Sequence, residues 1–290
     1  MPALKQALLS ALPENIHATV KTALAEDIHN GDLTAGLIPE GNETQATVIC
    51  RDDATIAGTA WFTDTFNQID SNIHINWLVF DGDRVEKNTV LCEITGNARH
   101  ILTAERTALN FLQTLSATAT ETAKYVAAIS HTKCEILDTR KTIPCLRDAQ
   151  KYAVLCGGGK NHRKGLYDGI LIKENHIIAA GSIKNAVQQA KLAHSHIKIE
   201  VEAETLDEMD QALAAGANIV LLDNMNNEEL IAAVATIKHS ESHAKLEASG
   251  GITLESIVAT AETGVDFISI GNLTKNINAI DLSMRFKQEN

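Results

Sequence analysis

Apolar segments alternate with helical segments along the second half of the chain, from about Cys134 to about Gly271. The apolar segments have strand length, and the segments between them have the spacing of amphipathic helices. Alternating strands and helices build a parallel sheet covered by helices. The six predicted strands are Glu135–Thr139, Gly169–Lys173, Ile197–Ala203, Ile219–Asp223, Lys245–Ser249 and Phe267–Gly271. No dinucleotide-binding glycine pattern accompanies them, so the alternation favours an α/β barrel over an open Rossmann sheet.

The helices predicted between these strands end at residues suited to helix termination. Gly216 and Gly264 follow two of them, at the position where a left-handed residue commonly ends a helix. The four predicted helices are Ile183–Ala193, Leu206–Ala215, Glu228–Ile237 and Leu254–Thr263.

The first 115 or so residues follow a different pattern. One long helix, or two in succession, is predicted over Thr103–Ile129, between this region and the alternating region. The other elements predicted here are strands at Ala46–Arg51, Ile73–Val79 and Val90–Thr95, and helices at Glu14–Ala25 and Trp61–Gln68.

Polar residues stand at the carboxyl ends of the predicted barrel strands. In an α/β barrel those ends converge on one face, and that face carries the active site. A series of six polar strand ends therefore predicts a single pocket built from residues far apart in sequence. The residues are Arg140, Lys141, Lys173, Glu174, Glu202, Asp223, Ser249 and Gly271.

Charge is distributed unevenly along the chain. The segment from Asp138 to His176 has a formal charge of +4, whereas the whole chain has −12 and the remainder therefore −16. Concentrated positive charge beside a Gly-Gly-Gly turn indicates a pocket for a small ligand with several negative charges. The acidic isoelectric point, near 5.4, and the aromatic content of 4% argue against a nucleic-acid-binding surface.

The cysteines and the apolar runs indicate a cytoplasmic protein. The five cysteines include no CxxC pair, which argues against a zinc ribbon or a dithiol redox motif and favours reduced thiols. The opening residues lack a cleavage-site pattern, and no apolar run approaches the ~18 residues of a membrane span. We expect no membrane association.

Two carboxylates are candidates for chemistry at the pocket. Glu202 and Asp223 end adjacent strands, where they could hold a divalent cation, bind ribose hydroxyls or stabilise a developing positive charge. Either one alone could instead cap its strand end. Glu200 and Glu204 share the strand parity of Glu202, and Glu200 is expected deeper in the barrel, in an ion pair.

The remaining candidates suit anions of two kinds. Ser249, Gly250 and Gly251, together with Gly271, would let backbone N–H groups face a phosphate without obstruction by a Cβ atom. Arginine and histidine present directional donors suited to carboxylates, and lysine is a compact cation suited to phosphate. The carboxylate candidates are Arg140, His162 and Arg163, and the lysine candidates are Lys141 and Lys173.

Nine runs spread in order from Leu24 to Thr274 resemble those of the quinolinate phosphoribosyltransferase family. They are LAEDIHNGDLT, ERTALNFLQTLS, DTRKTxPxLR, KYAVLCGGGKNHR, LIKENH, EVEAET, LLDNM, EASGGI and DFISIGNLT. The resemblance implies an α/β fold with an N-terminal α/β sandwich domain and a C-terminal incomplete, TIM-like α/β barrel. We place these domains at residues 1–115 and 116–275, with residues 276–290 packing back on the first.

The resemblance also implies an activity. Such an enzyme transfers phosphoribosyl from phosphoribosyl pyrophosphate to quinolinate with Mg²⁺, and yields nicotinate mononucleotide, pyrophosphate and CO₂ for NAD biosynthesis. It implies a homodimer as well, with a higher oligomer left open. In this family the arginine that matches Arg106 enters the active site of the other subunit.

The family's site residues carry over onto matching positions of this chain. Catalysis would fall to Lys141, Lys173, Glu202 and Asp223, with Mg²⁺ held by Glu202 and Asp223 or mainly by substrate phosphates. The implied substrate-binding residues are Arg106, Arg140, His162, Arg163, Ser249, Gly250, Gly251, Gly271, Asn272 and Lys275. Three positions depart from the family's usual residues: Cys145 replaces a glycine, Asn272 an alanine, and Lys275 a phosphate-contacting histidine.

Three alternatives stay open at this point. A related phosphoribosyltransferase could act on another pyridine or base, although a monocarboxylate would need fewer cations than this chain offers. Lys173, on an apolar strand, could form a Schiff base in an aldolase-like lyase. A non-catalytic ligand sensor could also keep the anion pocket.

Overall fold

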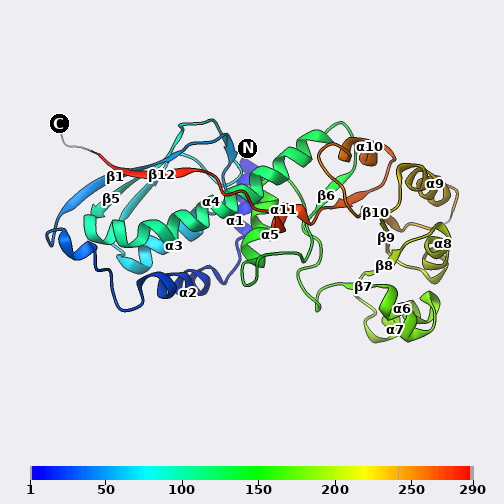
Figure 1. Ribbon diagram of the computed structural model, residues 1–290. Coiled ribbons are helices and arrows are strands. Elements are labelled where there is room, and N and C mark those ends of the chain that lie inside the picture. Colours follow the sequence, from blue (N-terminus) through cyan, green and yellow to red (C-terminus); the bar gives the residue numbers. More distant parts are fainter. Residues whose placement is uncertain (1, 241, 288–290) are drawn as a thin grey trace. The chain divides into compact units, whose positions relative to one another are not determined.

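The computed structural model describes residues 2–240 and 242–287, with side chains described from Lys5 onward. It divides into two compact units (Figure 1). The first unit is Met1–Ala123 with Thr142–Gly158 and Leu273–Asn290, and the second is Lys124–Lys141 with Gly159–Asn272. The predicted division between residues 115 and 116 stays a prediction.

The first unit contains a four-stranded antiparallel sheet with the order β12-β1-β5-β3. Its central strand, β1, alternates buried and less buried residues toward its end, so one face packs on the core. The C-terminal strand β12 pairs with β1, with Met284 opposite Val48. The strands are β1 (Glu43–Cys50), β3 (His74–Trp77), β5 (Val90–Asn97) and β12 (Leu282–Phe286), with a separate pair β2 (Ala54–Thr55) and β4 (Arg84–Val85).

Helix α3 (Thr59–Ile69) covers this core with aromatic side chains. Phe62 is fully buried and contacts Phe66 and Trp77, with ring centroids 5.0 and 5.2 Å apart. Such tilted and edge-on contacts add to the stabilisation from apolar burial. The other helices with residues in this unit are α1 (Pro2–Ser10), α2 (Ile16–Ile28), α4 (Ala98–Ala128), α5 (Arg147–Cys156) and α11 (Asn272–Lys275).

The second unit is built on six parallel strands in the order β6-β11-β10-β9-β8-β7. Consecutive strands from β7 to β11 are neighbours, and the last strand, β11, pairs with the first, β6. This is the cyclic order of a barrel that lacks pairing between β6 and β7, and Lys160 forms an isolated bridge beside β6. The strands are β6 (Glu135–Leu137), β7 (Ile170–Ile172), β8 (Ile199–Ala203), β9 (Ile219–Asp223), β10 (Lys245–Ser249) and β11 (Phe267–Ser269).

Helices cover the outside of these strands, with α8, α9 and α10 along β8, β9 and β10 (Figure 1). Gly216 ends α8 with a φ of 80°, and Gly264 follows α10 with a φ of 95°, as the sequence predicted. The helices are α6 (Glu174–Ala180), α7 (Ile183–Ala193), α8 (Leu206–Ala215), α9 (Asn227–Lys238) and α10 (Ile257–Glu262). The prediction of an α/β fold with an incomplete barrel is confirmed.

None of the described helices combines the length and the hydrophobicity that crossing a bilayer requires.

Candidate active site

A cavity of about 260 Å³ opens at the carboxyl ends of the second unit's strands. It draws at least one residue from each of the six strands or from the segment that directly follows one of them. The convergence of polar strand ends that the sequence predicted is therefore present. The lining residues are Thr139, Arg140, Lys141, His162, Arg163, Leu171, Lys173, Glu202, Leu221, Asp223, Glu247, Ser249 and Ser269.

Two arginines form the cationic wall of this cavity. Burial, together with repulsion from Arg140, lowers the pKa of the Arg163 guanidinium from its ordinary value. Arg163 donates from Nη1 to the carbonyl oxygen of Gly169 at 3.2 Å, which directs the side chain along its own loop. A Cβ atom at Gly169 would lie 3.0 Å from the Arg163 Cβ, so the loop passes close to Arg163 at this glycine. Two neighbouring guanidinium groups favour a ligand with more than one negative charge.

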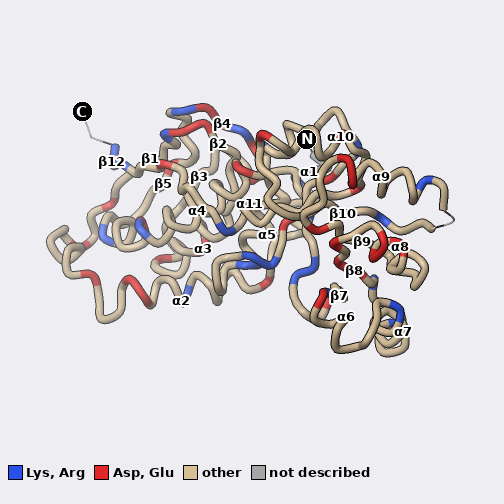
Figure 2. The backbone as a smooth tube through the Cα atoms, turned by 45° about the vertical axis from the view of Figure 1, so that its right-hand side comes forward, with Lys and Arg blue, Asp and Glu red and all other residues tan. Residues whose placement is uncertain are grey.

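The acidic wall lies across β8 and β9, whose last residues include Glu202 and Asp223. Figure 2 shows basic and acidic segments side by side around β7, β8 and β9. Glu202 is ion-paired with Lys173, which follows β7. Asp223 accepts a hydrogen bond from Asn224 Nδ2 at 2.8 Å. Cationic and anionic groups in one cavity suit a substrate that carries negative charge and develops positive charge during reaction.

The predicted phosphate-binding residues follow β10 and β11. Ser249 lines the cavity, whereas Gly250, Gly251, Gly271 and Asn272 are not among the described lining residues. Gly250 has a φ of 105°, and a Cβ atom there would lie 2.2 Å from the side-chain oxygen of Asn224. The chain can therefore pass so close to Asn224 only with glycine at this position.

Gly271 is also constrained by a neighbour. A Cβ atom on Gly271 would lie 3.0 Å from Cδ of Lys141, which places this glycine against a lysine that lines the cavity.

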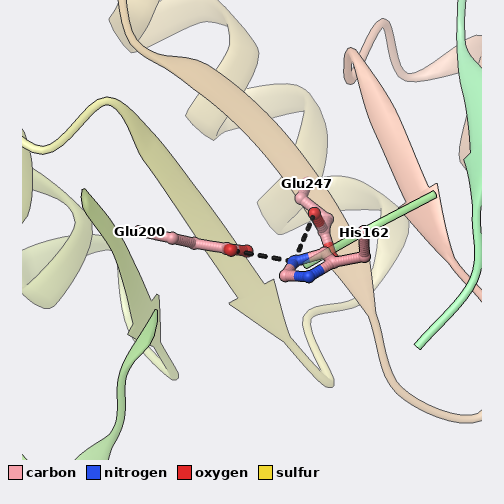
Figure 3. Close-up of side chains that lie close together, drawn as sticks. All are labelled: His162, Glu200 and Glu247. Carbon is pink, nitrogen blue, oxygen red and sulfur yellow. Dashed lines mark ion pairs between the residues drawn. The ribbon is translucent and has the colours of Figure 1, made fainter. Parts of the chain in front are cut away.

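His162 clusters with two buried glutamates, Glu200 and Glu247, and His162 and Glu247 line the floor of the cavity (Figure 3). The Nε2 atom of His162 lies 2.8 Å from Oε2 of Glu200 and 3.6 Å from Oε2 of Glu247. The deep ion pair that the sequence predicted for Glu200 is therefore present. Burial and repulsion from Glu200 raise the pKa of Glu247 to about 8.

Glu247 was not among the residues selected from the sequence. It stands two residues before Ser249 on β10, so both side chains point to the same side of the sheet. That parity was a usable signal, but the run KLEAS carries no other indication that its glutamate faces the barrel interior.

A second cavity, of about 350 Å³, opens beyond this floor among residues of the strands' amino ends. His162, Arg163 and Glu247 line both cavities, so the cluster stands between them. The remaining lining residues are Glu135, Leu137, Lys160, Asn161, Asp168, Gly169, Ile170, Lys198, Glu200, Ile219 and Phe267.

Two sequence-predicted site residues belong to the first unit and are therefore not placed against the cavity. Arg106 is exposed on α4 and makes no ion pair with the residues that the structure describes. Lys275 is exposed at the end of α11.

The cavity's carboxylates can be tested for their fit to Mg²⁺. Glu202 and Asp223 offer oxygen donors at adjacent strand ends, which is the donor type that Mg²⁺ requires. Two carboxylates are fewer than a full octahedral set, and this suits an ion that keeps waters and substrate phosphates as further ligands.

Known proteins match this chain over nearly its whole length. Residues 32–116 match the family model "Quinolinate phosphoribosyl transferase, N-terminal domain", and residues 118–285 match the corresponding C-terminal domain. A probable nicotinate-nucleotide pyrophosphorylase (carboxylating) of Bacillus subtilis is 42% identical, and the alignment covers 89% of each chain. A chloroplastic nicotinate-nucleotide pyrophosphorylase (carboxylating) of Arabidopsis thaliana is 38% identical over 95% of this chain and 84% of that protein.

A solved structure agrees with the sequence matches. The nicotinate-nucleotide pyrophosphorylase of Francisella tularensis superimposes with a TM-score of 0.91 at 51% identity, and covers 95% of this chain and 97% of that one. Both family models, the curated relatives and this structure agree with the nine runs from which the resemblance was predicted. The chain belongs to the quinolinate phosphoribosyltransferase family.

Proposed function

We propose that this chain is a quinolinate phosphoribosyltransferase (decarboxylating) and that the 260 Å³ cavity is its active site. It converts quinolinate and phosphoribosyl pyrophosphate to nicotinate mononucleotide, pyrophosphate and CO₂ in NAD biosynthesis. The observation that carries the assignment is the pairing of two neighbouring arginines with two strand-end carboxylates in one cavity. A dicarboxylate needs the two arginines, and an oxocarbenium-like ribose needs the two carboxylates.

Quinolinate binds through its two carboxylates at the cationic wall. Arg140 and Arg163 supply planar, bidentate donors, and His162 stands beside them at the floor. The clamp holds the pyridine nitrogen toward the anomeric carbon, which lowers the barrier by positioning. Lys141 and Lys173 lie on the same face and offset the remaining charge.

The phosphoribosyl donor binds at the later strands. Ser249 and the glycines after it present backbone N–H groups to the 5′-phosphate, with Gly271 and Asn272 as further phosphate ligands. Glu202 and Asp223 would contact the ribose, between base and phosphate. They would also hold Mg²⁺, which neutralises the pyrophosphate leaving group when bound.

Two bond exchanges complete the reaction. The bond from the anomeric carbon to pyrophosphate breaks as the pyridine nitrogen bonds to that carbon, and Glu202 and Asp223 stabilise the positive charge that develops on the ribose. The bond between C2 and its carboxylate then breaks, CO₂ leaves, and the electron pair remains on C2 beside the cationic ring nitrogen. C2 takes up a proton.

The assembled enzyme is a homodimer in which Arg106 of each protomer reaches the cavity of the other. Its exposure on α4, without an ion pair to described residues, leaves it available for this role. We expect the protein to act in the cytoplasm.

The Schiff-base alternative is disfavoured by the surroundings of Lys173. A Schiff-base lysine requires an apolar pocket or another cationic group beside it. Lys173 is instead 47% exposed and ion-paired with Glu202.

The test is turnover in the presence of quinolinate, phosphoribosyl pyrophosphate and Mg²⁺. We expect stoichiometric release of CO₂ and pyrophosphate, and a loss of about 10²- to 10³-fold in kcat for Glu202→Ala or Asp223→Ala. Turnover with nicotinate but not quinolinate would favour the related phosphoribosyltransferase. Undiminished activity of the double variant would refute the mechanism.

A further inference from the structure

Both ring nitrogens of His162 are engaged by protein atoms. Nδ1 accepts a hydrogen bond from the backbone N–H of Arg163 at 2.7 Å. Nε2 lies 2.8 Å from Glu200 Oε2, and only 13% of the side chain is exposed. The ring is therefore tied to the next residue along the chain on one side and to β8 on the other (Figure 3).

These contacts determine which nitrogen carries the proton. A backbone N–H can only donate, so Nδ1 must be unprotonated, and the one ring proton belongs to Nε2. The Nε2–H group then donates to Oε2 of Glu200 at 2.8 Å. An imidazolium would instead place two N–H donors face to face across 2.7 Å.

The same tautomer argues against a metal ion in the cluster. One donor atom from each of His162, Glu200 and Glu247 lies within 4.8 Å of the others, which is compatible with metal binding by distance alone. Coordination would need the lone pair of Nε2, and the histidine would then have to donate from Nδ1 to an acceptor. Nδ1 faces a donor, so the cluster fits a proton better than a cation.

Within the cluster of His162, Glu200 and Glu247, the proton shared by the two carboxyl groups resides on Glu247. Its residue is 0% exposed, and neither carboxylate oxygen has a hydrogen-bond partner among the described residues. Two adjacent buried carboxylates cannot both ionise without large repulsion. Because Glu200 accepts from His162, Glu247 is the member of the pair that holds the proton, and burial together with repulsion from Glu200 raises its pKa to about 8.

We propose that Glu200 and Glu247 are positioning residues for quinolinate recognition, acting through His162 on Arg163. Glu200 fixes the ring by accepting from Nε2–H, and the ring in turn anchors the backbone N–H of Arg163. Glu247, in its neutral form, fills the space beside them without adding a buried negative charge below the anion pocket. This inference rests on the proposed function and adds two residues to it.

His162, the residue before Arg163, is also held through its own backbone. The backbone N–H of His162 donates to Asp138 Oδ1 at 2.8 Å, and Asp138 is fully buried after β6. Arg163 is thus placed from two sides of the barrel opening, by β6 and by β8. The charged groups that share the two cavities with Glu247 are Arg140, Lys141, His162, Arg163, Lys173, Glu202 and Asp223 in the first, and Glu135, Lys160, Asp168, Lys198 and Glu200 in the second.

The first experiment compares three variants in steady-state kinetics. Glu200→Leu removes the acceptor of the Nε2–H group, so we expect KM for quinolinate to rise about 10- to 100-fold while KM for phosphoribosyl pyrophosphate changes less than about threefold. Glu200→Gln keeps an acceptor and should recover most of the loss. Glu204→Gln is the matched control, because Glu204 directly follows β8 but is exposed and lies outside both cavities.

The second experiment uses pH and a variant that preserves shape. In the wild type, KM for quinolinate should rise about tenfold from pH 7 to pH 9, because a group with a pKa of about 8 is mostly ionised at pH 9. Glu247→Gln has no ionisable group there, so its ratio of KM at the two pH values should stay within about twofold. A pH dependence equal to that of the wild type would overturn the role given to Glu247, even if Glu200→Leu fails to fold.

A double-variant cycle separates positioning from direct contact. If Glu200 acts through His162, then Glu200→Leu combined with His162→Ala should raise KM no further than His162→Ala alone. The proposal would be contradicted if the effects of the two substitutions on KM multiplied. It would also be contradicted by a stoichiometric metal ion that is lost in His162→Ala. Should the wild type release no CO₂ from quinolinate, the proposed function itself fails; should it do so while Glu200→Leu matches Glu204→Gln, this inference alone fails.

Discussion

At the residue scale, Cys145 has a backbone conformation that cysteine adopts with strain. Its φ is 65°, in the left-handed region, and its side chain is exposed. A Cβ atom in this region costs roughly 1–2 kcal/mol, whereas glycine has no such cost. The glycine that the family resemblance led us to expect at this position would carry no such strain, and this chain keeps the turn without it.

Cys145→Gly should accordingly stabilise the protein. Part of the relief is offset by the greater freedom of glycine in the unfolded chain, so we expect a net gain of about 0.5–1 kcal/mol. The measurement is the urea midpoint of unfolding, with Cys145→Ala as a control that keeps the Cβ atom. A midpoint of Cys145→Gly no higher than that of Cys145→Ala would contradict the strain.

Glu247 gives the second residue-scale prediction, which concerns stability. Its pKa is raised from 4.5 to about 8 in the folded protein, so the folded state holds a proton that the unfolded state has released between these values. The folded state is then favoured fully below pH 4.5 and progressively less as pH rises to 8. From pH 5 to pH 8, the wild type should lose stability relative to Glu247→Gln. Urea midpoints that fall in parallel for both proteins would exclude a raised pKa.

At the element scale, the residues at the helix N-termini contain most of the local sequence information about where the helices begin. Asn226 caps α9: its side chain accepts from the backbone N–H groups of Glu228 and Glu229, and Glu229 accepts from the backbone N–H of Asn226. Thr205 and Ser182 cap α8 and α7 through their side-chain oxygens, which accept from the backbone N–H groups of Glu208 and Asn185. These capping bonds satisfy N–H groups that a helix cannot pair internally, so the helix bounds follow the sequence closely.

Asn226→Ala should cost about 1 kcal/mol, because it leaves two N–H groups of α9 without their side-chain acceptor. Amide hydrogen exchange should accelerate in the first turn of α9 and remain unchanged in α7. Asn226→Ser is the matched control, since serine keeps a capping oxygen and should retain most of the stability. Uniform acceleration in both helices would point to a global effect instead.

At the scale of the whole molecule, the proposed dimer predicts sites shared between protomers. Arg106→Ala and Asp223→Ala should each be inactive, because one lacks the residue given to the partner and the other lacks a residue of its own cavity. After dissociation and reassociation of an equal mixture, half of the dimers are mixed, and each has one intact site of two. We expect recovery of about one quarter of wild-type activity.

The control for this experiment mixes Glu202→Ala with Asp223→Ala. Both residues lie in the same cavity, so no combination restores an intact site, and the mixture should stay inactive. Recovery in that control, or none in the Arg106→Ala mixture, would argue that Arg106 acts within its own protomer or not at all.

The strand and helix pattern of the second unit was predictable because it depends on local periodicity. The predicted bounds of β9, β10, α7 and α8 agree with the structure, and those of the other strands differ by one or two residues at an end. Helix α5 and strand β12 were not predicted. Their residues carry mixed polar and apolar character, and in β12 the strand state depends on pairing with β1, more than 230 residues earlier.

The sequence by itself determined which strand ends converge. Alternating strands and helices form a parallel sheet, and the carboxyl ends of its strands all lie on one face of the barrel. The family could be recognised from runs of residues alone. Only the tertiary structure decided how the side chains of the site interact with one another. That His162 is bound on both nitrogens, that Glu200 is its acceptor and that Glu247 stays neutral depend on distances between strands that are remote in sequence. No local pattern encodes such distances, because they arise only when the barrel brings β8 and β10 together around one histidine.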